Sequence, residues 1–305
     1  MKQNQSIIFG TFAETGEQLR HALFLVESVR TFAGKYKDAP IWVCIPPHLL
    51  GKNRQLEGSI TALKATIKTS EAPEEALRFY FARKVYAAGK AEAEAEGNAD
   101  ILVWMDEDTI VLSEPKDFKL KDGIGFAYRP VMHNRSGSLY SEPPGSFWSR
   151  IYEILSVDDN LLFPMVTPAD RQTIRAYFNA GLLVVRPERR ILRRWGEDFT
   201  TLYTDSILAD MCDNDIEKKI FIHQTALVGA VLNNLSKEEM IELSDRYNYP
   251  IFFHQQYEAE KEFGSIEDII TLRYDVYFRN PDPEWDKKLK GPPRIVKWLQ
   301  ERLGK

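Results

Sequence analysis

Short apolar runs alternate with stretches of helical periodicity along the first third of the chain, and this alternation limits the possible folds. Ser6 to Phe9 is predicted as a short buried strand, and Glu17 to Phe32 follows with apolar side chains at helical spacing. Ile41 to Ile45 and Ala65 to Lys68 are two further strand-like runs, and Pro73 to Glu96 is predicted as one long helix. Such alternation is typical of βαβ units, which form a parallel sheet with helices on both faces. We therefore predict an α/β fold with a mostly parallel, Rossmann-like central sheet.

Residues 129–170 interrupt this pattern, because they are rich in Pro, Ser, Gly and aromatic residues. We interpret them as a long insertion, which is either a lid or acceptor-binding segment or a packed surface excursion. Residues 1–305 are predicted to form a single domain in which residues 276–305 are a C-terminal extension. The other predicted strands are Ile110 to Leu112, Ile124 to Tyr128, Phe178 to Val185 and Ile269 to Tyr274, and the other predicted helices are Phe147 to Leu155, Pro187 to Ala209, His223 to Leu232 and Ile295 to Leu303.

The composition excludes several classes of protein. The formal net charge of -5, with both signs mixed along the chain, argues against nucleic acid as a partner. No stretch approaches the roughly 20 apolar residues of a membrane span, and Met1 to Gln5 lacks the features of a signal peptide. We therefore predict a cytoplasmic protein. Cys44 and Cys212 are the two cysteines, too few for a disulfide framework or a paired-cysteine zinc site.

An acidic triplet, Asp106-Glu107-Asp108, directly follows the apolar run Ile101 to Met105. In open α/β sheets, ligands bind beyond the carboxyl ends of the strands. In an extended backbone, Asp106 and Asp108 face one ion while Glu107 points elsewhere. Two carboxylates suit Mn²⁺ or Mg²⁺, which could bridge a diphosphate and stabilise its departure as a leaving group. The alternative is a solvated acidic turn after a strand.

Three segments, in the same order, resemble those of GT-A-fold glycosyltransferases, particularly glycosyltransferase family eight with its glycogenin-like and galactosyltransferase-like enzymes. Ile101 to Val111 resembles the D-x-D segment, Phe178 to Val185 resembles the F-N-x-G strand, and Gln224 to Leu227 resembles part of the D-Q-x-x-L helix. The resemblance implies a GT-A fold and transfer of a sugar from a nucleoside-diphosphate donor, with a UDP-sugar expected, to an unknown acceptor. It also implies a divalent metal, Mn²⁺ or Mg²⁺.

The resemblance also assigns expected roles to individual residues. Asp106 and Asp108 would bind the metal, and Asn179 and Gln224 would line the sugar and acceptor side. Lys84 resembles a basic residue that the family carries on the helix before the D-x-D strand. Each of the last three has an alternative structural explanation: a turn for Asn179, a surface position for Gln224 and a solvated helix face for Lys84. The full set of expected substrate-binding residues is Thr11, Lys84, Asp106, Asn179, Gln224 and Arg273.

Several positions depart from the family pattern. His223 and Thr225 stand where the family carries acidic residues, and the stretch from Thr271 to Val276 contains no histidine for the metal. Three substitutes are conceivable: Asp275 completes an all-oxygen site, His254 reaches in, or Arg273 neutralises the diphosphate directly.

These departures leave open whether transfer retains or inverts the sugar stereochemistry. They also make a non-catalytic relative that only binds a nucleotide sugar, or acts as a scaffold, the main alternative to an enzyme. A nucleotidyltransferase is a weaker alternative, because Gly10 to Gly16 lacks the lysines and arginines that such an enzyme carries after its first strand.

Overall fold

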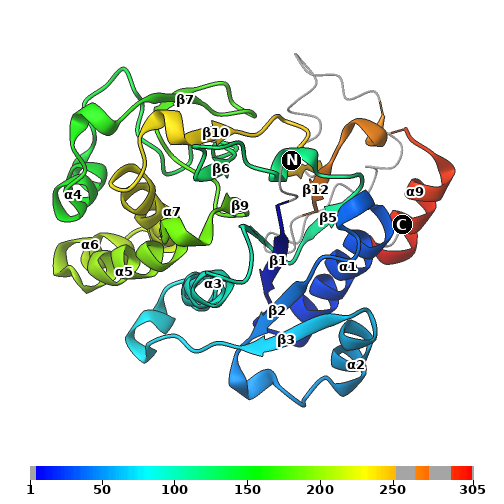
Figure 1. Ribbon diagram of the computed structural model, residues 1–305. Coiled ribbons are helices and arrows are strands. Elements are labelled where there is room, and N and C mark those ends of the chain that lie inside the picture. Colours follow the sequence, from blue (N-terminus) through cyan, green and yellow to red (C-terminus); the bar gives the residue numbers. More distant parts are fainter. Residues whose placement is uncertain (1–4, 252–264, 275–289, 304–305) are drawn as a thin grey trace.

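The computed structural model describes residues 5–251, 265–274 and 290–303, and its centre is a seven-stranded sheet (Figure 1). Neighbouring strands are parallel except that one strand, β9, runs antiparallel to both of its neighbours. The predicted mostly parallel α/β architecture is therefore confirmed. In spatial order the strands are β10 (Met240–Glu242), β6 (Phe126–Tyr128), β9 (Leu182–Val185), β4 (Ile101–Met105), β1 (Ile7–Phe12), β2 (Ile41–Ile45) and β3 (Ala65–Thr69).

Helices cover both faces of the sheet, which explains why its central strands are apolar throughout. On β4, Leu102 and Trp104 pack into the core on one face, while Val103 and Met105 pack into the core on the other. Helix α1 (Gly16–Phe32) contributes to the second core, together with Ile60 of α2 (Arg54–Ala62). The first core is covered by α3 (Ala82–Ala95), α4 (Ser146–Leu155), α5 (Ile191–Thr204), α6 (Ser206–Asp213) and α7 (Ile216–Leu232), which lie on the opposite side of the sheet from α1 in Figure 1.

Two helices are shorter than the sequence predicts, and both corrections have local causes. The predicted helix from Pro73 to Glu96 is a 3-10 turn followed by α3, because Phe81 adopts a left-handed conformation with φ of 62°. The predicted helix from Pro187 to Ala209 divides at Asp205, whose carboxylate accepts a hydrogen bond from the backbone N–H of Leu208. Asp205 therefore starts α6 as its N-cap.

A second, three-stranded sheet lies beside the main one. It contains β11 (Tyr249–Pro250), β12 (Thr271–Arg273) and β5 (Thr109–Val111), and β12 runs antiparallel to β5. Their register places Arg273 opposite Thr109, the residue after the acidic triplet. Helix α9 (Pro293–Leu303) packs on this sheet through Leu299.

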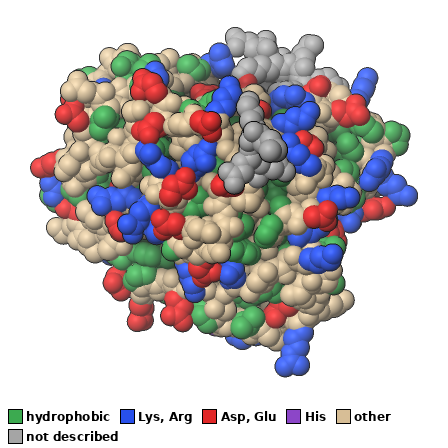
Figure 2. Space-filling model, viewed as in Figure 1, with side chains coloured by type: hydrophobic (Ala, Val, Ile, Leu, Met, Phe, Trp, Pro, Cys, Tyr) green, Lys and Arg blue, Asp and Glu red, His purple; other side chains and the backbone are tan. Residues whose placement is uncertain are grey.

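The predicted insertion, residues 129–170, is folded against the rest of the molecule. Phe147 and Trp148 of α4 are buried, and β7 (Pro164–Val166) pairs with β8 (Thr173–Arg175). Within the described part of the chain, no helix combines the length and apolar character needed to cross a membrane. Figure 2 shows positive and negative side chains interspersed over the face in view.

Candidate functional site

A cavity of about 440 Å³ lies where the parallel strands β1 and β4 end. Phe12, the last residue of β1, lines the cavity. The acidic triplet that follows the adjacent strand, β4, also lines it. Polar side chains reach the same space from three further elements: Lys84 from α3, Gln224 from α7 and Arg273 from β12. The topology therefore gathers side chains from distant parts of the sequence at one edge of the sheet.

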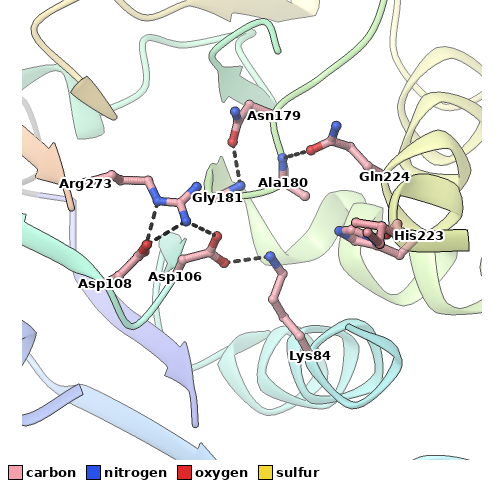
Figure 3. Close-up of polar contacts among 10 residues, drawn as sticks. Lys84, Asp106, Asp108, Asn179, Ala180, Gly181, His223, Gln224 and Arg273 are labelled. Atoms are coloured by element: carbon pink, nitrogen blue, oxygen red, sulfur yellow. Dashed lines mark hydrogen bonds and ion pairs between the residues drawn. The ribbon is translucent and has the colours of Figure 1, made fainter. Parts of the chain in front are cut away.

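Two carboxylates and two cations form a closed ion-pair cluster in this cavity (Figure 3). The Lys84 Nζ atom lies 2.6 Å from Asp106 Oδ1. Arg273 donates from Nε to Asp108 Oδ1 at 2.9 Å and from Nη2 to Asp108 Oδ2 at 2.8 Å. The same Nη2 lies 3.1 Å from Asp106 Oδ2. All four carboxylate oxygens therefore face a cationic nitrogen.

The cluster keeps Asp106 ionised. Burial alone would raise the pKa of its carboxyl group, but Lys84 and Arg273 outweigh burial and lower that pKa. Lys84 is itself buried, with its Nζ 5.2 Å from the centroid of the Phe81 ring. The solvated helix position that was the alternative for Lys84 is therefore wrong.

In an extended backbone Glu107 would point away from the site. In the structure it does not. The chain turns after β4, with the Thr109 N–H donating to the Asp106 carbonyl at 3.1 Å. This turn lets Glu107 line the same cavity as the two aspartates. Burial, followed by the charges of Asp108 and Asp106, raises the pKa of Glu107 to about 8. The raised pKa favours the protonated form of this carboxyl group, which can donate a hydrogen bond.

The segment before β9 forms a turn whose backbone N–H groups are bound by two amide side chains of the cavity, Asn179 from the turn itself and Gln224 from α7. Asn179 Oδ1 accepts the Gly181 N–H at 2.8 Å, and Gln224 Oε1 accepts the Ala180 N–H at 3.1 Å. The predicted strand from Phe178 therefore begins only at Leu182. Gly181 passes close to the ion pairs: a Cβ atom there would lie 2.6 Å from Arg273 Nη1.

His223 lines the cavity in addition to the expected residues. Its Nδ1 donates to the Ile220 carbonyl at 2.8 Å. Burial, helped by the charge of Lys84, lowers the pKa of His223 to about 3. The ring is therefore neutral, and Nε2 carries no proton and can accept a hydrogen bond. The sequence analysis identified His223 only as a departure from the family pattern. Its position next to Gln224 on a buried helix was the signal that could have identified it as a cavity residue.

Of the six expected substrate-binding residues, five line the cavity and Thr11 does not. Thr11 is fully buried within β1, and the next residue, Phe12, provides the wall instead. Sequence analysis also missed Phe81 and Tyr177, which line the cavity without belonging to any recognised motif. Asp275 and His254, two of the conceivable substitutes for the missing metal ligand, lie outside the described residues.

The described residues do not fit a divalent metal. Among residues 5–251, 265–274 and 290–303, no three His, Cys, Asp or Glu side chains are grouped to hold one. Asp106 and Asp108 approach each other closely, but Arg273 Nη2 contacts both of them. A metal shared by these carboxylates would have to occupy the place of that nitrogen.

Comparison with protein families identifies the family of the chain. Residues 11–233 match the model of the Rhodobacterales glycosyltransferase domain, a span of more than half the chain that contains β4, the turn before β9 and α7. The chain belongs to this glycosyltransferase family. A search of curated proteins finds no significant match.

Solved structures with the same fold are also glycosyltransferases. The bifunctional glycosyltransferase WbbM is 11% identical with a TM-score of 0.56, and the match covers 100% of this chain but only 50% of WbbM. The galactosyltransferase LgtC, solved with donor and acceptor sugar analogues, is 12% identical with a TM-score of 0.51, covering 96% and 95% of the two chains. Mouse xyloside xylosyltransferase 1 is 10% identical with a TM-score of 0.51, covering 91% and 100%. These matches confirm the expected GT-A fold.

Proposed function

We propose that this glycosyltransferase transfers a sugar from a nucleoside-diphosphate donor, with a UDP-sugar as the expected donor, to an acceptor that enters over residues 131–136. The observation that carries the proposal is a pair of cations, the buried Lys84 and the partly buried Arg273, that line one cavity at the carboxyl ends of β1 and β4. A diphosphate is the part of such a donor that needs positive charge, both when it binds and when it leaves.

The other cavity residues suit the sugar. Gln224 and Asn179 present amide groups, His223 presents an unprotonated ring nitrogen, and Glu107 presents a carboxyl group whose raised pKa favours its protonated form. Together they offer both donors and acceptors to hydroxyl groups. One LgtC structure is of an active-site glutamine-to-glutamate variant. We propose that Gln224 has the corresponding place here, facing the reacting sugar.

Residues 131–136 are the proposed entry for the acceptor. They belong to the segment predicted as an insertion, and Val131, His133 and Arg135 line the same cavity as the D-x-D turn. We propose that the protein works in the cytoplasm, as the sequence analysis predicts.

Replacement of Lys84 tests the donor site. Lys84→Gln keeps a polar side chain but removes one charge-assisted contact with phosphate, so we expect about a 10- to 100-fold loss of UDP affinity. Isothermal titration calorimetry of the folded variant measures this. Lys90→Gln is the matched control, because Lys90 lies exposed on the same helix and donates to the Thr69 carbonyl. If the wild-type protein binds none of UDP, GDP or their sugars, with or without Mn²⁺, the proposal is wrong.

A non-catalytic protein that binds nucleotide sugars is the second candidate. It is favoured by His223, a neutral residue where the family carries a carboxylate. Release of free nucleoside diphosphate from a donor sugar, measured with and without Asp106→Ala, separates the two. Release that depends on Asp106 identifies an enzyme, and tight binding without release identifies the binding protein.

A further inference from the structure

The carboxylate pair of the D-x-D turn already has a cation, and it comes from the chain itself. We propose that Arg273 takes the place that a divalent metal would have between Asp106 and Asp108, so that nucleoside diphosphates bind this protein without a metal. The inference rests on the proposed function for the identity of the ligand, but the state of the carboxylates can be measured independently of any nucleotide.

The contacts of the guanidinium group leave no shared position for a metal ion. Arg273 Nη2 lies 2.8 Å from Asp108 Oδ2 and 3.1 Å from Asp106 Oδ2, while Nε lies 2.9 Å from Asp108 Oδ1. Lys84 engages the remaining oxygen, Asp106 Oδ1, at 2.6 Å. A Mg²⁺ or Mn²⁺ ion binds carboxylate oxygens at about 2.1 Å. An ion shared by the two aspartates would therefore displace the guanidinium and then be repelled by it.

The fold fixes Arg273 in this position. Arg273 is the last residue of β12, and strand pairing sets it opposite Thr109, one residue beyond Asp108. The adjacent residue, Leu272, is buried in the third hydrophobic cluster, which anchors the strand. On the other side, Gly181 provides the space, since any Cβ at that position would meet the guanidinium and the Asp106 carboxylate. The register of β12 against β5 thus sets the position of Arg273, and the absence of a side chain at Gly181 leaves room for its guanidinium group.

The chemistry of the two cations suits a diphosphate. Guanidinium stays charged at every working pH and offers several N–H donors in one plane, while an ammonium group offers three donors. Asp106 and Asp108 hold both groups at the cavity wall and balance their charge in the absence of ligand. In this arrangement the carboxylates orient the phosphate-binding cations and do not themselves coordinate an ion.

Calorimetry of UDP binding to chelator-treated protein tests the role of Arg273. We expect the affinity to be the same in EDTA and in Mn²⁺, and Arg273→Ala to weaken it about 10- to 100-fold in EDTA. Arg273→Lys keeps the charge but loses the bidentate geometry. Its affinity for UDP should lie between those of the wild type and Arg273→Ala. The matched control is Arg150→Ala, which also removes an arginine paired with an aspartate, Asp205, but one that does not line the cavity. UDP binding that requires Mn²⁺ would overturn the inference while supporting the proposed function.

Direct Mn²⁺ binding, followed by electron paramagnetic resonance without nucleotide, provides the second readout. The wild-type protein should bind no Mn²⁺ at the D-x-D turn, whereas Arg273→Ala exposes both carboxylates and should gain a site. That site should disappear when Asp108→Asn is added. Wild-type Mn²⁺ binding that is lost in Asp108→Asn would contradict the inference. If no nucleotide binds under any condition, the proposed function fails, and the Mn²⁺ measurements still decide what occupies the carboxylates.

Discussion

Gly181 lies in the turn before β9, where the backbone passes close to both Arg273 and Asp106. A Cβ atom at this position would lie 2.6 Å from Arg273 Nη1, 2.9 Å from Asn179 Oδ1 and 3.0 Å from Asp106 Oδ2. The φ angle of Gly181 is not in the left-handed region. The constraint is therefore the space that a methyl group would fill, and not the conformational freedom of glycine.

Gly181→Ala should consequently disturb the ion pairs rather than the backbone. We expect a loss of donor affinity of about 10-fold or more, since charge-assisted contacts depend on geometry. Titration with UDP measures the effect. Gly58→Ala is the control: Gly58 is exposed on α2 with nothing within 4 Å of an added Cβ. It should leave binding unchanged and raise stability by about 0.5–1 kcal/mol. An unchanged affinity in Gly181→Ala would show that the ion pairs are not needed for donor binding.

At the scale of elements, α3 supplies the cap of α5. Arg190, which precedes α5, has no capping side chain, and Glu92 of α3 accepts the backbone N–H groups of Leu192 at 3.0 Å and Arg193 at 2.9 Å. A carboxylate at a helix N-terminus satisfies unpaired donors and interacts favourably with the helix dipole. Burial nevertheless raises the pKa of Glu92 to about 7, although these N–H groups and Arg193 oppose the rise.

This cap predicts a pH-dependent component of stability. The pKa of Glu92 rises from 4.5 to about 7 on folding. Between these values the folded state holds a proton that the unfolded chain releases, so the free energy of unfolding decreases as pH rises. The decrease should be about 3 kcal/mol. Urea unfolding at several pH values should show this component in the wild type and not in Glu92→Gln. Glu94→Gln, on the same helix, should retain it; equal pH profiles for all three proteins would refute the assignment.

Elements differ in how far the sequence alone could predict them. The strand Ile101–Met105 and its acidic end were predictable because a run apolar on both faces must be central in a sheet. The break at Phe81 was not, because a left-handed residue inside a helical pattern carries no periodic signal. The Arg273–Asp108 contact joins residues 165 positions apart and depends on the register of two short strands. The sequence could therefore name Arg273 but could not choose it over Asp275 or His254.

At the scale of the whole molecule, the C-terminal helix supports the strand that carries Arg273. Leu299 of α9 is fully buried in one cluster with Ile110 of β5 and Leu272 of β12. Helix α9 also contacts α1, through the ring pair Phe32–Trp298 and an ion pair at 2.6 Å between Arg302 and Glu27. In Figure 1, α9 lies beside α1, on the side of the sheet away from α5 and α7. The packing of α9 is thus connected to the cavity through β12, the strand that carries Arg273.

Leu299→Ala should therefore weaken both the fold and the site. Removing a buried leucine side chain costs about 2–5 kcal/mol of stability, and the loosened β12 should also lower the affinity for UDP. Denaturant unfolding and calorimetry on the same preparations measure the two effects. Leu208→Ala is the matched control, because Leu208 is equally buried on α6 in the core on the other side of the main sheet. Leu208→Ala should lower stability by a similar amount and leave the affinity for UDP unchanged. If both variants lower affinity equally, the C-terminal helix has no specific connection to Arg273 and the site responds only to global stability.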